Sequence, residues 1–312
     1  MTKAFNGRAV LSKVCNFLTI YMVLSFLIPP LYLAIFHPGI SQVGAALLLM
    51  NTELLGWFEI VKIPLGFLLF HLMRKKKLFW DDLKLRGERK MTPQALLIII
   101  AFNLLGQMVF TFVTPLLEWV FNLFGLSIMA AVQSATLEGN QAWSLLIYAA
   151  FVAPVFEEVA FRGAILSSFR PKGKIYAIVL SSLLFGIFHA NIPQALFATC
   201  IGLVFAYVTI EYAIGWAIFL HIFNNFFLGT VTGYIEQFLG LPESTLSAVL
   251  VFGGGITAII TFILKRKEFI TYIKENKLEK GAFKQTFTSI PFWIFLLLCL
   301  ILAWQYVMPI GM

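Results

Sequence analysis

Apolar runs of about twenty residues recur along the whole chain, and they limit its possible folds more than any other feature. Of the 312 residues, 60% are hydrophobic and 12% are charged, a balance that a soluble core does not call for. Lipid offers no hydrogen-bond partners to open backbone groups, and the runs are too continuous for barrel strands, so each run must cross as a helix. We therefore expect an all-α polytopic membrane protein.

The apolar runs predict about nine transmembrane helices, with eight as the alternative count. The expected spans are 14–36, 54–73, 95–114, 143–169, 175–190, 195–211, 213–230, 246–264 and 290–308. We expect N-terminal transmembrane helices at 1–142, a core of four helices at 143–230 and C-terminal helices at 231–312. The first part contains a basic loop at 74–94, and the last part contains a basic segment at 265–285.

The positions of the basic residues predict the orientation of the chain. Of the 23 Lys and Arg residues, 21 lie within 3–13, 74–90, 170–174 and 265–284. The intervening loops at 115–142 and 231–244 contain none. Because cytoplasmic loops carry an excess of Lys and Arg, we expect a multi-pass protein of the cell membrane with a cytoplasmic N-terminus.

The net charge of +8 comes from these same loops, so we expect anionic lipids at the cytoplasmic face as partners, and no nucleic acid. In the last basic segment, Phe269, Ile270 and Ile273 recur at helical spacing among lysines. One interpretation is an amphipathic helix on the inner leaflet. The other is a solvated loop that anchors the preceding span.

Three ionisable residues lie inside the span 143–169, namely Glu157, Glu158 and Arg162. Charges at that depth are costly unless they are paired or functional, which makes this span the first candidate for a site. Glu158 and Arg162 are four residues apart on a helix and face each other, whereas Glu157 points elsewhere. The alternative interpretation is a structural Glu158–Arg162 pair with Glu157 as a hydrogen-bonded passenger.

Two other spans carry polar residues at a similar depth. His189 follows Phe185 at the end of 175–190, and His221 and Asn225 share a face of 213–230. At 1.5 Å of rise per residue, Glu157, His189 and Asn225 all lie roughly 20 Å from the basic ends of their spans. A carboxylate and an imidazole at one level can activate a water, and a second imidazole with an amide suits the resulting oxyanion.

No serine or cysteine competes with this water as a nucleophile. Ser181, Ser182 and Cys200 lack a G-x-S-x-G turn or an adjacent base, so the pattern indicates hydrolysis without a covalent intermediate. All three cysteines, Cys15, Cys200 and Cys299, fall within spans, which excludes a disulfide framework and a CxxC metal pair.

The three motifs Glu157-Glu158-x-x-x-Arg162, Phe185-x-x-x-His189 and His221-x-x-x-Asn225 resemble, in order and each on its own helix, those of a known family. This is the CAAX-protease and bacteriocin-processing family (CPBP or Abi) of glutamate-dependent intramembrane endopeptidases. The resemblance covers about 143–228. It implies Glu157 as general base, His189 as its partner on the water and an oxyanion site of His221 and Asn225, with Glu158, Arg162 and Phe185 in support.

The resemblance also implies a membrane-inserted or membrane-associated peptide substrate and no cofactor. Bacterial members of this family act in peptide maturation, bacteriocin self-immunity or signalling. We expect one of these roles for this chain in preference to cleavage of a prenylated substrate. Three alternatives remain open. They are a zinc metalloprotease with Glu157, His189 and His221 as ligands, a proton-coupled transporter, and a non-proteolytic scaffold or immunity protein.

Overall fold

The computed structural model describes residues 5–136, 142–276, 278 and 281–310. In this part of the chain the regular structure is helical except for one pair of two-residue strands. Seven of its helical runs are long and apolar enough to cross a membrane: Gly7–Phe36, Thr52–Arg74, Pro93–Asn122, Trp143–Lys172, Ile192–Glu211, Ile214–Leu239 and Thr245–Glu275. The predicted all-α polytopic membrane protein is confirmed.

Two of the nine expected spans are shorter than predicted. They form α10 (Lys174–Phe188) and α16 (Ile290–Trp304), apolar helices of 15 residues each. The apolar sequence continues past the end of α10, but Ala190 adopts a positive φ of 48° and breaks the helix. Asn191 then caps the next helix by accepting a hydrogen bond from the Gln194 N–H at 3.1 Å.

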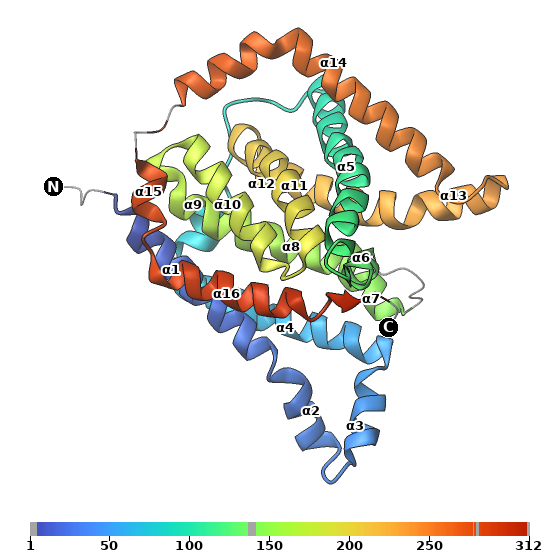
Figure 1. The fold of residues 1–312 in the computed structure, drawn as a ribbon. Coiled ribbons are helices and arrows are strands. Elements are labelled where there is room, and N and C mark those ends of the chain that lie inside the picture. Colours follow the sequence, from blue (N-terminus) through green and yellow to red (C-terminus); the bar gives the residue numbers. More distant parts are fainter. Residues whose placement is uncertain (1–4, 137–141, 277, 279–280, 311–312) are drawn as a thin grey trace.

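The first span is divided into α1 (Gly7–Ser25) and α2 (Ile28–Phe36), because Pro29 and Pro30 supply no backbone donors to continue α1. α2 and α3 (Gln42–Leu49) form a hairpin that projects from the bundle (Figure 1). Neither helix of the hairpin has a buried residue. This matches a lipid-facing arm.

α4 (Thr52–Arg74) returns along α1 and leads into the short π-helix η1 (Leu78–Asp82), where Asp82 Oδ2 lies 2.6 Å from Arg74 Nε. The following loop reaches the turn after α11 (Ile192–Glu211), where Gly87 N–H donates to the Tyr212 carbonyl at 2.8 Å. α5 (Pro93–Asn122) then runs to the other end of the molecule, followed by β1 (Leu126–Ser127) and α6 (Met129–Thr136).

The central helical run is a succession of short elements without a break in the chain. These are α7 (Trp143–Ile147), η2 (Tyr148–Val152), α8 (Ala153–Glu158), η3 (Val159–Ile165), α9 (Leu166–Phe169) and η4 (Arg170–Lys172). Three of its helical neighbours in sequence complete the core, α10, α11 and α12 (Ile214–Ile222). α12 continues into η5 (Phe223–Val231) and α13 (Thr232–Leu239).

The C-terminal part lies on the outside of this core (Figure 1). α14 (Thr245–Glu275) packs along α5 and extends into the last basic segment as one helix up to Glu275, so 265–275 is neither a separate surface helix nor a loop. α15 (Ala282–Thr286) and α16 then pack against α1. β2 (Met308–Pro309) closes the described chain by pairing antiparallel with β1.

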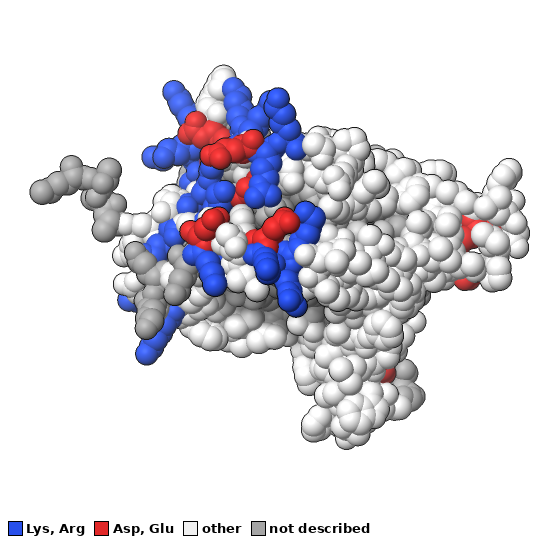
Figure 2. Space-filling view, turned by 90° about the horizontal axis from the view of Figure 1, so that it is seen from above, with Lys and Arg blue, Asp and Glu red and all other residues white. Residues whose placement is uncertain are grey.

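Figure 2 shows the Lys and Arg residues gathered at one end of the molecule, the end at which α1 begins. We call this the basic end, formed by 8–13, 74–90, 170–174, 265–276 and 281–284. Lys3, Lys277 and Lys280, which were predicted to lie on the same side, are outside the described residues. The clustering matches the alternation of basic loops and loops without Lys or Arg, from which the orientation was predicted.

Candidate functional site

The first and third motifs lie in helices with π-helical stretches, since η2 and η3 flank Glu157 and Glu158, η3 contains Arg162 and η5 contains Asn225. π-turns inside α-helices are rare and occur frequently at functional sites. In η2 the Ala153 N–H donates to the Tyr148 carbonyl, which is the π pattern. The same pattern would pair the Ala149 carbonyl with residue 154, but Pro154 has no N–H. The Asn225 side chain donates to this carbonyl instead, at 3.0 Å.

Glu158 lies at the centre of a fully buried charged cluster. Its Oε1 atom is 3.1 Å from Arg162 Nη1 and 2.9 Å from His221 Nδ1. Both Glu158 and Arg162 have no exposed side-chain surface. A buried charge is tolerated when it is paired, and Arg162 supplies the counter-charge for Glu158. His221 adds a second contact to Glu158 from another helix, and the sequence analysis did not predict this contact.

The Phe185 ring packs against the charged cluster. The Arg162 guanidinium lies 4.2 Å from the centre of the Phe185 ring, a cation–π distance. The rings of His189 and His221 lie 4.8 Å and 5.9 Å from the same ring. Gly202 of α11 allows the close approach, because its carbonyl accepts from Arg162 Nη2 at 3.3 Å and a Cβ there would crowd that nitrogen.

Of the two motif carboxylates, Glu157 is the one that is partly exposed. Its side chain is 15% exposed, and its Oε2 atom lies 3.7 Å from His221 Nε2. His221 therefore lies between the two glutamates, with Nδ1 toward Glu158 and Nε2 toward Glu157. A carboxylate with some access, beside an imidazole that a second carboxylate orients, can act in proton transfer.

His189 ends α10 and is oriented by its own helix. Its Nδ1 atom lies 2.8 Å from the Phe185 carbonyl oxygen, and a carbonyl can only accept, so Nδ1 carries the proton. Nε2 of the neutral ring is then free to accept a hydrogen bond from a water. His189 is half-buried, in contrast to the buried His221.

Sequence reasoning missed a polar network on the Asn225 side of the site. The adjacent Asn224 is buried and accepts from Gln107 Nε2 at 2.7 Å and from Asn103 Nδ2 at 3.4 Å, and it donates to Asn225 Oδ1 at 3.2 Å. Asn103 and Gln107 are four residues apart in a mostly apolar helix, a signal comparable to the one used for Glu158 and Arg162. The network holds α5 against η5.

A second ionisable pair within a span was also missed, on α4. Glu59 and Lys62 form an ion pair there, and Tyr148 of η2 makes a hydrogen bond to Glu59. The link between Glu59 and Tyr148 joins α4 to the π-helical stretch that precedes Glu157.

The alternative zinc site requires three converging ligands. Within the described part of the chain, no group of three or more His, Cys, Asp and Glu side chains is arranged to hold a metal ion. Glu157 and His221 lie close together, but His189 makes its polar contact with the Phe185 carbonyl.

Comparisons with known proteins agree with the location of these motifs. Residues 139–227 match the family model described as type II CAAX prenyl endopeptidase Rce1-like. A Bacillus subtilis (strain 168) protein named "Putative membrane peptidase YdiL" is 33% identical over an alignment of 122 residues that covers 36% of this chain and 50% of that protein. No solved structure matches the chain.

The chain thus spans about half the length of the curated relative that it matches. The matched region contains α7 to α12, all three motifs and every contact of the buried charged cluster. The resemblance predicted from the motifs is confirmed, and residues 139–227 are similar to the Rce1-like CAAX endopeptidases.

Proposed function

We propose that this protein is a membrane endopeptidase that hydrolyses a peptide bond with a water activated inside the helical core. The observation that carries the proposal is the placement of His221 between Glu158 and the partly exposed Glu157, with contacts of 2.9 Å and 3.7 Å. A structural ion pair needs one carboxylate. The second carboxylate and the oriented imidazole are what hydrolysis needs.

In the proposed mechanism, Glu157 accepts a proton from the water while the water oxygen attacks the substrate carbonyl carbon. His189 Nε2 accepts a hydrogen bond from the second O–H of the water, which keeps that hydrogen, and so orients the attack. The proton then passes from Glu157 to the leaving nitrogen as the carbon–nitrogen bond breaks. One water is consumed, one amine and one carboxylic acid are formed, and no covalent intermediate on the protein is required.

The oxyanion of this reaction needs hydrogen-bond donors. In its doubly protonated form His221 donates to Glu158 through Nδ1 and offers Nε2–H to the oxyanion. Asn225 has two N–H groups, of which one donates to the Ala149 carbonyl, so the other is available. Arg162 and Phe185 act indirectly, because they hold Glu158 and the two imidazoles in place.

The proposed substrate is a membrane-inserted or membrane-associated peptide, because the site lies within the helical core. The relationship to CAAX endopeptidases and the printed name of the Bacillus protein both support this class. We place the activity in bacterial peptide maturation, bacteriocin self-immunity or signalling. The glutamic-type mechanism uses Glu157, His189, His221 and Asn225 and no metal.

The test is cleavage of membrane-inserted candidate peptides by the purified protein in lipid nanodiscs, followed by mass spectrometry. Glu157→Gln keeps shape and hydrogen bonding but cannot take the proton, so we expect a loss of about 10²- to 10⁴-fold. The matched control is Glu275→Gln, an exposed glutamate at the end of α14. Activity of Glu157→Gln within about tenfold of wild type would exclude the general-base role.

Two further results of the same assay separate the alternatives. A metalloprotease loses activity with a chelator and regains it with zinc, whereas the proposed mechanism is indifferent to both. A scaffold or immunity protein cleaves none of the peptides even as wild type. A proton-coupled transporter instead acidifies or alkalises the lumen of sealed vesicles when its solute is added.

We also propose that the protein lies in the cell membrane with the basic end in the cytoplasm. Single cysteines at Glu275, on the basic end, and Glu243, at the opposite end, test this in a background without Cys15, Cys200 and Cys299. A membrane-impermeant thiol reagent should label Glu243→Cys in intact cells and Glu275→Cys only after lysis. The reverse pattern would contradict the proposed orientation.

A further inference from the structure

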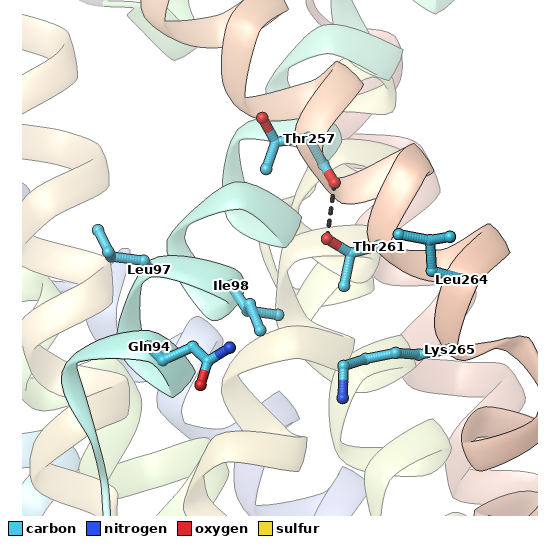
Figure 3. A pocket seen from close by; sticks show the side chains of 7 residues that line it. All are labelled: Gln94, Leu97, Ile98, Thr257, Thr261, Leu264 and Lys265. Carbon is cyan, nitrogen blue, oxygen red and sulfur yellow. Dashed lines mark hydrogen bonds between the residues drawn. The ribbon is translucent and has the colours of Figure 1, made fainter.

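An open groove of about 470 Å³ lies between α5 and α14, outside the helical core that carries the motifs. Figure 3 shows the residues that line it, from the beginning of α5 and the middle of α14. They are Gln94, Leu97, Ile98, Thr257, Thr261, Leu264 and Lys265. The groove is open to the side, since Leu97 and Leu264 are 68% and 78% exposed.

Most of the groove is apolar despite its two threonines. Thr257 Oγ1 donates to the Gly253 carbonyl and Thr261 Oγ1 donates to the Thr257 carbonyl, both at 2.8 Å (Figure 3 draws the second bond). Because these hydroxyls are used by their own helix, the threonines offer methyl groups to the groove. The polar side chains of the lining are then Gln94 and Lys265, at one end.

That polar end attracts anions for two independent reasons. Lys265 is half-exposed and pairs with Glu268 at 3.2 Å, an exposed pair that contributes little and exchanges easily for another anion. Gln94 lies in the first turn of the 30-residue helix α5, which has no acidic residue in that turn. The positive end of the α5 dipole therefore has no carboxylate beside it, only the Thr92 hydroxyl that accepts from the Ala95 N–H, and it faces the same groove as Lys265.

The groove also lies at the depth of lipid headgroups. α14 has 31 residues, about 46 Å of helix, whereas the hydrocarbon core of a bilayer is about 30 Å thick. The twenty residues 245–264 are uncharged and fill that thickness, and Lys265 is the first charged residue of the helix. Lys265 thus lies at the interface, with the apolar part of the groove extending from it into the bilayer.

We propose that this groove binds one anionic phospholipid. The phosphate lies between Lys265 and the N-terminus of α5, and an acyl chain follows Leu97, Ile98 and Leu264. A peptide is a poorer occupant, because its backbone groups would need partners in lipid and the groove offers only Gln94 and Lys265. The bound lipid would fill the gap between α5 and α14 near the basic end, and this inference does not depend on the proposed protease activity.

The first test is native mass spectrometry of the full-length protein with added phosphatidylglycerol or phosphatidylcholine of the same acyl chains. Phosphatidylglycerol should bind more tightly than phosphatidylcholine. Lys265→Ala should weaken phosphatidylglycerol binding about fivefold, the factor expected for one basic side chain at an anionic surface. The matched control Lys267→Ala removes an exposed lysine of the same helix that does not line the groove, and should change binding little.

The second test fills the groove. Ile98→Trp should abolish the tight phosphatidylglycerol site, whereas Ile256→Trp, on an exposed part of α14 outside the groove, should leave it intact. Equal effects of Lys265→Ala and Lys267→Ala would show diffuse electrostatic attraction and overturn the site. Equal binding of the two lipids, or unchanged binding in a folded Ile98→Trp protein, would overturn it as well. Lys265 is exposed, so its variant remains informative if Ile98→Trp fails to fold.

Discussion

Two helical runs of nearly equal length, Trp143–Lys172 and Thr245–Glu275, show opposite uses of a membrane span. They have 30 and 31 residues with mean hydropathy of 1.6 and 2.2, and each meets the criteria for crossing. Half of the apolar window of the first is buried in the protein, against 11% of the second. Hydropathy therefore identifies both as spans but does not distinguish the core from the periphery.

The position of the charges makes that distinction. The central run carries Glu157, Glu158 and Arg162 in its middle, and the peripheral run carries its charges from Lys265 onward, at the basic end. Ionisable groups in the middle must be enclosed by partners, which draws neighbouring helices around them. Charges at an end reach water or headgroups directly, so that helix can remain exposed to lipid.

The same contrast appears in the backbone. The peripheral run is one uninterrupted α-helix, whereas the central run contains the π-helical stretches η2 and η3. Irregular backbone is tolerated at membrane depth where protein groups satisfy the freed carbonyls. In the central run Asn225 does so for Ala149, and no such partner is available on a helix that faces lipid.

The largest effect on stability is expected for Arg162→Ala. This change leaves Glu158 as an unpaired charge in a fully buried position, which costs about 3–5 kcal/mol. The midpoint of thermal unfolding in detergent and the yield of inserted protein should both fall steeply. Arg170→Ala is the matched control, since Arg170 is exposed at the basic end and its removal should change neither.

The double variant Glu158→Gln with Arg162→Met tests the reason for that loss. It removes both charges, while the amide oxygen of the introduced glutamine can still accept a hydrogen bond from His221 Nδ1. Expression should recover in large part relative to Arg162→Ala alone. A single Arg162→Ala variant as stable as wild type would show that the pair does not hold the core and would remove the contrast with α14.

Sequence patterns predicted those parts of the molecule that depend on residues close together in the chain. Long apolar runs gave the spans, and the spacing of four residues predicted that Glu158 and Arg162 face each other, with Nη1 and Oε1 now found 3.1 Å apart. The contact between His221 and Glu158 joins two residues that are 63 positions apart in the sequence and lie on different helices. Such a contact depends on packing between helices, which periodicity does not determine.

The effect of Pro154 depends on a residue far away in the chain. The missing N–H leaves the Ala149 carbonyl to Asn225, which ties the first motif to the third. The end of α10 shows another limit, because nothing in its apolar sequence announces the positive φ of Ala190. Backbone geometry of this kind is imposed by tertiary contacts and is not encoded in local propensity.

A double-mutant cycle on Pro154 and Asn225 tests this link. Asn225→Ala alone leaves the Ala149 carbonyl without a donor and should lower the free energy of unfolding by about 1–3 kcal/mol. Pro154→Ala supplies an N–H at the position where the π pattern calls for one. In that background Asn225→Ala should cost less, by about 1 kcal/mol.

The cycle is measured by unfolding in a mixture of mild and denaturing detergents, with all four proteins compared under one condition. Asn225 loses its side chain in both pairs, so any catalytic role of that side chain does not enter the difference. An equal cost of Asn225→Ala in both backgrounds would show that Asn225 contributes through Asn224 and α5 instead of through the Ala149 carbonyl.

The smallest effect is the most direct comparison of the two regions, because one substitution should have opposite signs in them. A Cβ at Gly202 would lie 3.1 Å from Arg162 Nη2 and 3.2 Å from Phe185 Cδ1, both in the fully packed core. At Gly253 of α14 it would meet no atom within 4 Å. Gly202→Ala should therefore lower stability by about 1 kcal/mol through overpacking. Gly253→Ala should raise stability by about 0.5–1 kcal/mol, since alanine is the better helix former.

The thermal midpoints of the two variants should move in opposite directions. A shift of the same sign in both would mean that α14 is as tightly enclosed as the central run, by a partner helix or by ordered lipid, and that the core extends to the helix that now forms the periphery.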